Sequence, residues 1–405
     1  MNIAILGFGA SCWDRFPDPQ TGRELQVWGL AKELVRLGDC VTLFTSGRDD
    51  WETTKDGVRV VQRAPQKEPE ALVQGSKNCG ITRESLEFSA DVADSVKELN
   101  PEVLSLHYGL SGRDVSRLGI PYTYTFHVPD VMATFRRRVL GQEFSTYPVS
   151  VLELITELDV ASGACARFAL NRDMARYIER NLGWQCGVIP CGVDTSSFYS
   201  RGDEGYILYA GRFDWVKNIE VLLKAYSRLS AQARKGHHLR LVGSGVQEGA
   251  IRSLAVRLGV EDEVEVLPWM GREELRRQIA GCSFFVLPSS FETFSIVLIE
   301  AMASGKPVIA SDIPGPRDVV VPGTTGFLFP WWSVPELAKC MSALIEAPER
   351  RRGMGAASRR RAVERYSFFS MASLYRTQFL RMLEGRRDVL TARPSDMSPK
   401  ESLMP

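Results

Sequence analysis

The sequence predicts an α/β protein built from two doubly wound domains. Three observations support this prediction. Short apolar runs typical of buried strands alternate with segments in which apolar residues recur at helical spacing. This alternation occurs in both halves of the chain, which implies two parallel sheets covered by helices on both faces. The length of 405 residues also exceeds what a single core usually holds.

In the first half, apolar runs predict strands and helical periodicity predicts the segments between them. The strands are expected at residues 2–8, 40–47, 58–64, 102–109 and 121–129. Helices are expected at residues 22–38 and 84–100. Residues 160–183 are predicted to form a strand and then a helix, and residues 185–194 end this half.

The second half repeats the pattern, with strands expected at residues 205–213, 238–245, 263–269, 282–290 and 306–312. The polar stretch TSSFYSRGDEG separates the halves, so the domains are predicted at 1–194 and 195–365. A basic, largely helical segment follows Arg350, and the tail 393–405 is expected to be disordered. In doubly wound sheets, ligands bind at the carboxyl ends of the strands.

Composition excludes several classes of function. The net charge of +1 gives no reason to expect a nucleic-acid partner. No apolar stretch is long enough to span a membrane, and the first residues resemble a buried strand more than a signal peptide. None of the cysteines, at positions 12, 40, 79, 165, 186, 191, 282 and 340, forms a C-x-x-C pair. We therefore expect free thiols, no zinc site and a cytoplasmic location.

The stretch PSSFETFSIVLIEAMASGKPVIASDIPG places Glu292 and Glu300 eight positions apart, on a polar turn and on an apolar helix. A helix predicted at 294–302 would leave backbone N–H groups free at its start, which favours a phosphate. These are the amides of Thr293, Phe294, Ser295 and Ile296. Carboxylates on both sides of a phosphate site suit a nucleotide-sugar. The alternative is a solvated pair of helix glutamates.

A second stretch, GRFDWVKN, places Gly211, Arg212 and Lys217 between a strand and a helix. The two cations could neutralise a departing diphosphate, and the alternative for Lys217 is a solvated residue at a helix start. The glycine turn LVGSG, with Gly243, is weaker evidence because glycine pairs are common.

Together, GRFDWVKN, LVGSG, LPSSFETFSIVLIEAMASGKPVIAS and PGTTGFLF resemble the nucleotide-binding half of retaining GT-B glycosyltransferases of family 4. The resemblance extends to the first half through TGRELQVWGLAKELVRLGDCVTLFTSG, LSLHYGLSG, YTYTFHVPD and IPCGVDTSSF. It implies two Rossmann-like domains facing across a cleft, the first binding the acceptor and the second the donor. A helix at 366–392 would cross back to the first domain.

The resemblance also implies roles for individual residues. Glu300 would bind the ribose hydroxyls and Glu292 the donor sugar. Arg212 and Lys217, with amides at the start of the helix, would hold the diphosphate. His127 would lie near the donor sugar. The remaining donor-binding candidates are Gly9, Gly22 and the residues near the base, Trp269, Met270, Gly271 and Arg272.

Two positions depart from the family pattern. Arg23 stands where a second glycine is frequent, and its side chain would crowd a phosphate or extend a cation toward it. Ser295 replaces a frequent glycine in the turn before the helix. His107, like His127, follows a strand and is a weaker candidate.

The expected reaction moves a hexosyl group from a nucleotide-diphosphate sugar to an acceptor hydroxyl with retention, and without a metal or other cofactor. The acceptor could be a glycan, a lipid-linked molecule or a small molecule. The basic segment Arg136–Arg138 could meet an anionic acceptor or the inner membrane face, or be a solvated helix face. A nucleotide-sugar epimerase, a phosphorylase and a non-catalytic nucleotide-sugar-binding protein on the same fold remain alternatives.

Overall fold

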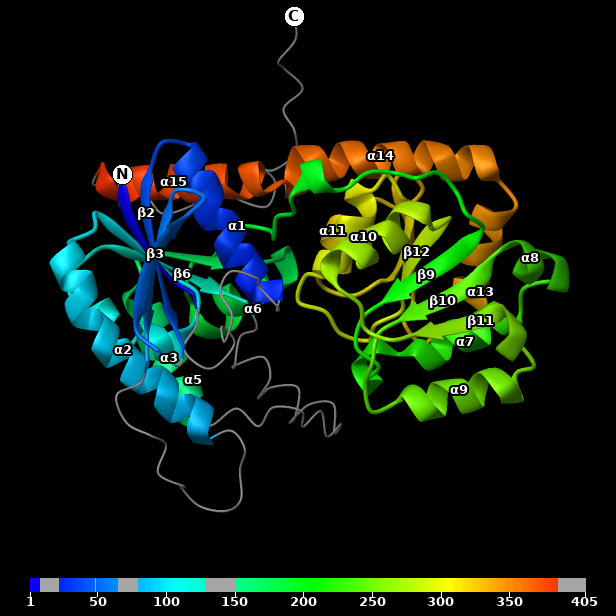
Figure 1. Cartoon of the computed structure of the whole chain (residues 1–405), viewed down its shortest axis with the longest axis horizontal. Coiled ribbons are helices and arrows are strands. Elements are labelled where there is room, and N and C mark those ends of the chain that lie inside the picture. Colours follow the sequence, from blue (N-terminus) through cyan, green and yellow to red (C-terminus); the bar gives the residue numbers. More distant parts are fainter. Residues whose placement is uncertain (8–21, 48, 65–78, 128–150, 385–405) are drawn as a thin grey trace, which may run out of the picture. The chain divides into compact units, whose positions relative to one another are not determined.

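The computed structural model describes residues 1–7, 22–47, 49–64, 79–127 and 151–384. The chain divides into two compact units, shown in Figure 1. Unit 1 comprises Met1–Pro190 with Met371–Pro405, and unit 2 comprises Cys191–Ser370. The first division point therefore lies four residues before the position 194 that the sequence suggested.

Unit 1 contains an eight-stranded sheet with strand order β3-β4-β2-β1-β5-β6-β7-β8. Its strands are β1 (Asn2–Leu6), β2 (Cys40–Ser46), β3 (Trp51–Lys55), β4 (Val58–Arg63), β5 (Val103–Leu106), β6 (Tyr122–Phe126), β7 (Ala166–Ala169) and β8 (Gly187–Val188). The helices are α1 (Gly22–Arg36), α2 (Cys79–Leu99), α3 (Gly109–Gly112), α5 (Val151–Gly163), α6 (Arg172–Leu182) and α15 (Phe368–Leu383), which begins in unit 2.

Two parts of unit 1 differ from the prediction. β3 was not predicted, and it pairs antiparallel with β4 in an otherwise parallel sheet. Asp56 and Gly57 between them both have positive φ, at 50° and 78°, which is the backbone of a tight hairpin turn. Residues 160–163, predicted as the start of a strand, form the end of α5, and the strand begins only at Ala166.

Successive side chains of each strand in unit 1 point to opposite faces of the sheet, so helices pack on both faces. One face of the sheet packs against α2 and α5 through Phe88, Val92 and Val160. The opposite face receives α15, where Tyr375 hydrogen-bonds to Thr125 at 2.8 Å. Buried Asp39 accepts from Arg376 of the same helix at 2.8 Å and from the N-terminal amine at 3.0 Å. The C-terminal helix is thus tied to the beginning of the chain.

Unit 2 contains a six-stranded, fully parallel sheet with strand order β11-β10-β9-β12-β13-β14. Its strands are β9 (Tyr206–Ala210), β10 (His238–Val242), β11 (Val264–Leu267), β12 (Phe284–Leu287), β13 (Val308–Ser311) and β14 (Gly326–Phe329). The helices are α7 (Ile219–Ser227), α8 (Ala231–Gly236), α9 (Glu248–Arg257), α10 (Arg272–Gly281), α11 (Ile296–Ala303), α12 (Pro316–Val319), α13 (Val334–Ile345) and α14 (Pro348–Tyr366).

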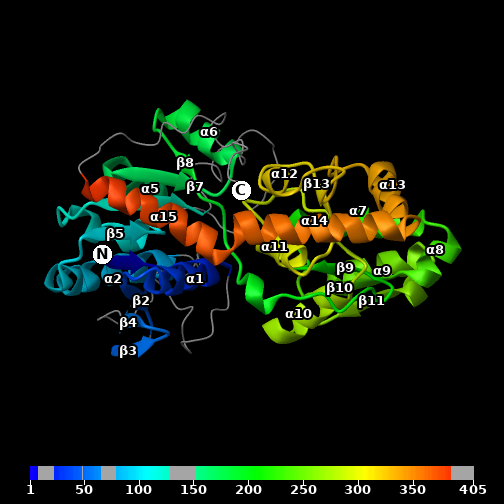
Figure 2. The ribbon, with the colours of Figure 1, turned by 90° about the horizontal axis from the view of Figure 1, so that it is seen from above.

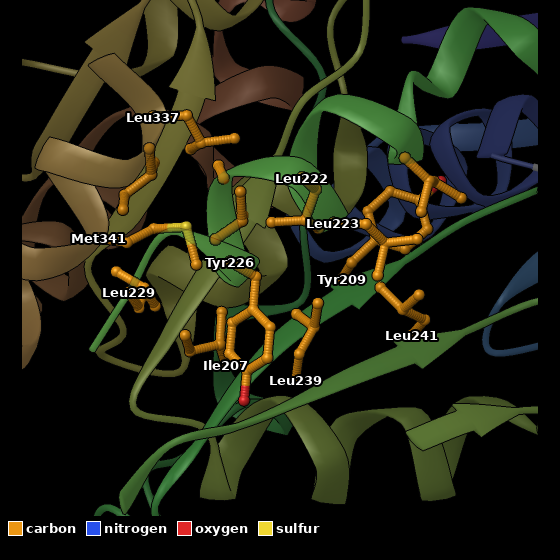
Figure 3. Packing of buried hydrophobic residues seen from close by; sticks show 14 of the residues in the cluster. Ile207, Tyr209, Leu222, Leu223, Tyr226, Leu229, Leu239, Leu241, Leu337 and Met341 are labelled. Atoms are coloured by element: carbon orange, nitrogen blue, oxygen red, sulfur yellow. The ribbon is translucent and has the colours of Figure 1, made fainter. Parts of the chain in front are cut away.

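Helices cover both faces of this second sheet (Figures 1 and 2). On one face, Leu222 and Leu223 of α7 and Leu337 and Met341 of α13 pack over β9 and β10, as Figure 3 shows. On the other face lie α10, α11 and α14, with α11 packed along α14. No helix among the described residues is both long and apolar enough to cross a membrane.

Candidate functional site

The order of the strands in unit 2 locates a natural ligand site. From β9 the chain proceeds outward to β10 and β11, and it then returns to the other side of β9 with β12, β13 and β14. The order therefore reverses between β9 and β12. In open α/β sheets, ligands bind at the carboxyl ends of the strands beside such a reversal. The loops that follow β9 and β12 are the ones that carry Lys217 and Glu292.

Hydrogen bonds hold these two loops together. The backbone N–H of Ser290 donates to the carbonyl of Val216 at 2.8 Å. The side-chain amide of Asn218 donates to the carbonyls of Pro288, at 3.1 Å, and of Trp331, at 2.8 Å. Asn218 has φ 54°, a left-handed conformation that asparagine tolerates better than most residues. Sequence reasoning missed Asn218, and the preference of asparagine for helix caps does not reveal this role, because the side chain makes no capping hydrogen bond to α7.

The first carboxylate of the predicted pair is surrounded by donors. Lys217 Nζ lies 2.6 Å from Glu292 Oε1, and the hydroxyl of Ser289 donates to the same oxygen at 2.8 Å. Both charged side chains are largely buried, with exposed fractions of 19% and 11%. The two predicted residues, 75 positions apart in the chain, therefore meet at the strand reversal. Ser289 is a further contact that the sequence did not single out.

The second carboxylate has a different cationic partner. Glu300 projects from α11, its side chain is only 7% exposed, and it accepts a hydrogen bond from Arg272 at 2.9 Å. Arg272 is the first residue of α10. Residues assigned separately to the ribose and to the base are thus in contact. A buried carboxylate needs a hydrogen-bonding or ionic partner, and Arg272 is that partner here. Ligand hydroxyls could donate hydrogen bonds to the same carboxylate.

The other cation of the β9–α7 loop is more exposed. The Arg212 side chain is 62% exposed and lies 3.1 Å from Asp214. Asp214 also accepts from the backbone N–H of Lys217 at 3.2 Å, so one carboxylate contacts Arg212 and caps the turn that carries Lys217. This capping role was missed, although an aspartate three residues before the capped position is a known signal.

The glycines in the neighbouring loops permit close packing of backbones. A Cβ on Gly243 would lie 1.9 Å from the carbonyl oxygen of Gly211, and one on Gly245 would lie 2.4 Å from that of Phe213. The turn after β10 can therefore lie directly against the loop after β9. Of the two glycines predicted to bind the donor, Gly243 is required at least by this packing, whereas a Cβ on Gly211 would lie 2.8 Å from the hydroxyl of Tyr209.

The start of α11 corrects the sequence prediction. The helix begins at Ile296, two residues later than expected. Ser295 has φ 82°, so the backbone cannot be helical at that position, and the side chain of Phe294 is buried against Tyr366. The amides of Thr293 and Phe294 therefore precede the first helical turn. The positive φ also explains why glycine suits position 295.

The predicted base-binding residues lie in the loop between β11 and α10. Trp269 and Gly271 are exposed, and Met270 is half-buried. Gly271 is the N-cap of α10 and has an extended backbone. This loop follows a strand of the same parallel sheet, so it reaches the same carboxyl edge as the loops that carry Lys217 and Glu292.

The remaining candidates belong to unit 1. His127 follows β6, is buried, and lies 3.0 Å from His107 through ring nitrogens. Gly22 is the exposed first residue of α1. Gly9 and the segment Arg136–Arg138 lie outside the described residues. Burial lowers the pKa of His107 to about 3. The pKa of His127 is lowered well below 6.5 by burial, with the charges of His107 and Arg23 acting in the same direction.

Comparison with known proteins identifies the family to which the chain is similar. The model of the family described as glycosyl transferases group 1 matches residues 196–361, and that of glycosyltransferase family 4 matches residues 21–197. A D-inositol 3-phosphate glycosyltransferase from Segniliparus rotundus is 26% identical over 391 residues, which cover 88% of this chain and 84% of the relative. An MMP alpha-(1->4)-mannosyltransferase from Mycolicibacterium hassiacum is 31% identical, with coverages of 64% and 65%.

Solved structures show the same fold. A sucrose-phosphate synthase from Thermosynechococcus elongatus superposes with a TM-score of 0.77 at 24% identity, over 95% of this chain and 99% of that one. The HepE protein from Anabaena, solved in complex with UDP, gives a TM-score of 0.70 at 18% identity, over 94% and 100%. The two family models together match residues 21–361. The chain therefore belongs to the family 4 glycosyltransferases and has their GT-B fold.

Proposed function

We propose that the protein transfers a hexosyl group from a nucleotide-diphosphate sugar to an acceptor hydroxyl with retention of configuration. The observation that carries the proposal is the arrangement at the β9/β12 reversal. There, Glu292 is paired with Lys217, and Glu300, eight residues later, is paired with Arg272. Solved structures of the HepE protein in complex with UDP and with UDP-glucose support the donor class.

In this proposal each charged group has a task. Glu300 accepts hydrogen bonds from the ribose hydroxyls, and Arg272 turns from the carboxylate toward the nucleotide. Lys217 and Arg212 neutralise the charge that develops on the leaving diphosphate, assisted by the free N–H groups at the start of α11. Glu292 accepts from hydroxyls of the donor sugar. Acceptor attack on the face from which the diphosphate leaves, with a phosphate oxygen taking the acceptor proton, gives retention.

The proposal assigns no metal, because two cations and a helix N-terminus supply the positive charge. Turnover is therefore expected to persist in the presence of a chelator. We assign donor binding to unit 2 and acceptor binding to unit 1. The reaction takes place at a membrane surface only if the acceptor is lipid-linked.

The first experiment is a thermal-shift panel with UDP, GDP, ADP and dTDP. A nucleotide at about 100 times its dissociation constant adds about 2.7 kcal/mol to the free energy of unfolding. Glu300→Ala is expected to weaken binding of the preferred nucleotide by about tenfold to a hundredfold, since a charged hydrogen bond is lost. Glu292→Ala mainly slows transfer. The control is Glu349→Ala, at an exposed position on α14.

Slow hydrolysis of the matching nucleotide-sugar then tests the chemistry without a known acceptor. Proton NMR of the first sugar released identifies its anomer, which retention predicts to be that of the donor. Release of the opposite anomer would overturn the retaining assignment. Conversion of the donor into a second nucleotide-sugar would indicate an epimerase. Near-wild-type turnover in both glutamate variants would exclude this site.

A further inference from the structure

Polar side chains share one face of two buried strands in unit 1. Ser105 of β5 and Thr123 of β6 are register partners in a parallel pair. His107 lies two positions after Ser105, and Thr125 and His127 lie two and four positions after Thr123. Side chains at spacings of two point to the same side of a strand. All five are buried, on the face that receives α15.

Four of these residues form a continuous chain of hydrogen bonds. The hydroxyl of Thr123 donates to Ser105 Oγ at 3.4 Å. Ser105 Oγ lies 3.1 Å from His107 Nε2, and His107 Nδ1 lies 3.0 Å from His127 Nε2. Among the described residues, His127 Nδ1 has no hydrogen-bond partner. Within the described residues, protein therefore engages only the Nε2 nitrogen of His127.

The direction of the protons along this chain follows from counting donors. A serine hydroxyl has one proton, and Ser105 already accepts from Thr123. In the described part of the chain, the acceptor within reach of the Ser105 proton is His107 Nε2. A neutral His107 then carries its proton on Nδ1 and donates it to His127 Nε2. A neutral His127 must in turn carry its proton on Nδ1.

The neutral state of both rings has a physical cause. Burial lowers the pKa of His107 to about 3. Burial also lowers the pKa of His127 well below its ordinary value of 6.5; the charge of Arg23, and that of His107 whenever its ring is protonated, act in the same direction. The ring of Tyr375 from α15, whose centroid lies 5.9 Å from that of His107, is also buried.

We propose that His107, oriented by Ser105 and Thr123, fixes His127 as the Nδ1–H tautomer. His127 then donates a hydrogen bond to an oxygen of the bound sugar and does not act as a proton acceptor. His107 is a positioning residue in this scheme. The identity of the ligand rests on the proposed function, whereas the tautomer is a property of the free protein. A His127 that only donates hydrogen bonds cannot take the proton of the acceptor hydroxyl. This matches the proposed reaction, in which a phosphate oxygen of the leaving group takes that proton.

Nitrogen-15 NMR of the histidine rings tests the tautomer directly. The chain has only four histidines, at positions 107, 127, 237 and 238, so each ring can be assigned by single substitution. Long-range proton–nitrogen correlations at about pH 7 distinguish the two neutral tautomers. We expect the Nδ1–H pattern for both His107 and His127. An Nε2–H pattern for His127, or a doubly protonated ring, would overturn the proposal.

Variants at position 107 separate positioning from packing. His107→Asn keeps an N–H donor close to the position of Nδ1, whereas His107→Phe keeps the ring shape without any donor. We expect His107→Asn to hold His127 as the Nδ1–H tautomer and to retain kcat within about threefold. His107→Phe should lower kcat by about tenfold, the equivalent of one lost hydrogen bond, with little change in KM for the donor. His238→Gln is the control.

The possible results distinguish the positioning role of His107 from the proposed transfer reaction. Equal kcat in His107→Asn and His107→Phe would refute a positioning role, whatever the tautomer. If His107→Phe does not fold, the NMR pattern of the wild-type protein and of Ser105→Ala still decides. Without the Ser105 hydroxyl, His107 should no longer favour the Nδ1–H tautomer. An unchanged nitrogen-15 pattern in Ser105→Ala would contradict the proposed direction of the hydrogen bonds. Absence of any transfer activity would overturn the proposed function but not the tautomer.

Discussion

Lowering the pH tests whether His107 and His127 are buried in neutral form. An unfolded histidine titrates near 6.5, whereas burial lowers the pKa of folded His107 to about 3. The unfolded state therefore binds more protons below about pH 6.5, so the free energy of unfolding falls with pH from about 6.5 toward 3. At about pH 5 the loss from His107 alone is about 2 kcal/mol. His127 contributes in the same direction, because its pKa is also lowered.

Urea unfolding at about pH 7.5 and about pH 5.0 measures this loss. Because the chain has two units, hydrogen exchange of peptides from β5 and β6 should accompany circular dichroism to report on unit 1. The wild-type protein is compared with His107→Gln, in which one titrating ring is absent. The control is His238→Gln, on β10 of unit 2.

His107→Gln is expected to lose about 2 kcal/mol less than the wild-type protein between the two pH values. The comparison uses the change with pH within each protein, so any destabilisation common to both pH values cancels. If the two proteins lose the same free energy of unfolding to within about 0.5 kcal/mol, His107 is not buried in neutral form. The argument for the tautomer of His127 would then lose its physical basis.

Three further predictions concern the backbone and the C-terminal helix. Gly243→Ala should destabilise unit 2 by about 3 kcal/mol in urea unfolding, because its Cβ would meet a backbone oxygen. The control is Gly249→Ala, on α9 with open space around it, which should be neutral or stabilising. Ser295→Gly should raise the free energy of unfolding by about 1 kcal/mol by relieving a positive φ, and a loss of stability would contradict this account. Arg376→Ala should destabilise unit 1 by about 1–3 kcal/mol, since buried Asp39 loses a partner; unchanged hydrogen exchange in α15 would count against the contact.

Much of the fold was predictable because the spacing of apolar residues along the sequence indicates where strands and helices lie. Apolar runs such as residues 2–8 and 282–290 were identified as strands, since a strand of a parallel sheet is buried on both faces. β3 was missed because its exposed, polar residues lie at the edge of the sheet, where no apolar run is needed. The end of α5 was misassigned because the small residues 160–163 suit either structure. Helix ends depend on local backbone angles, such as that of Ser295, which a pattern of residue types does not show.

The sequence by itself determined the two-domain α/β architecture and the family, because both depend on short local patterns: alternating apolar segments and motifs such as the glutamate pair. Only the tertiary structure decided which charges meet. Lys217 and Glu292 are far apart in the chain, as are Arg272 and Glu300, and the order of the parallel strands brings each pair together. The chain from Thr123 to His127 likewise exists because β5 and β6 are adjacent in register. Contacts between neighbouring strands depend on the topology of the sheet, and no single stretch of sequence contains that information.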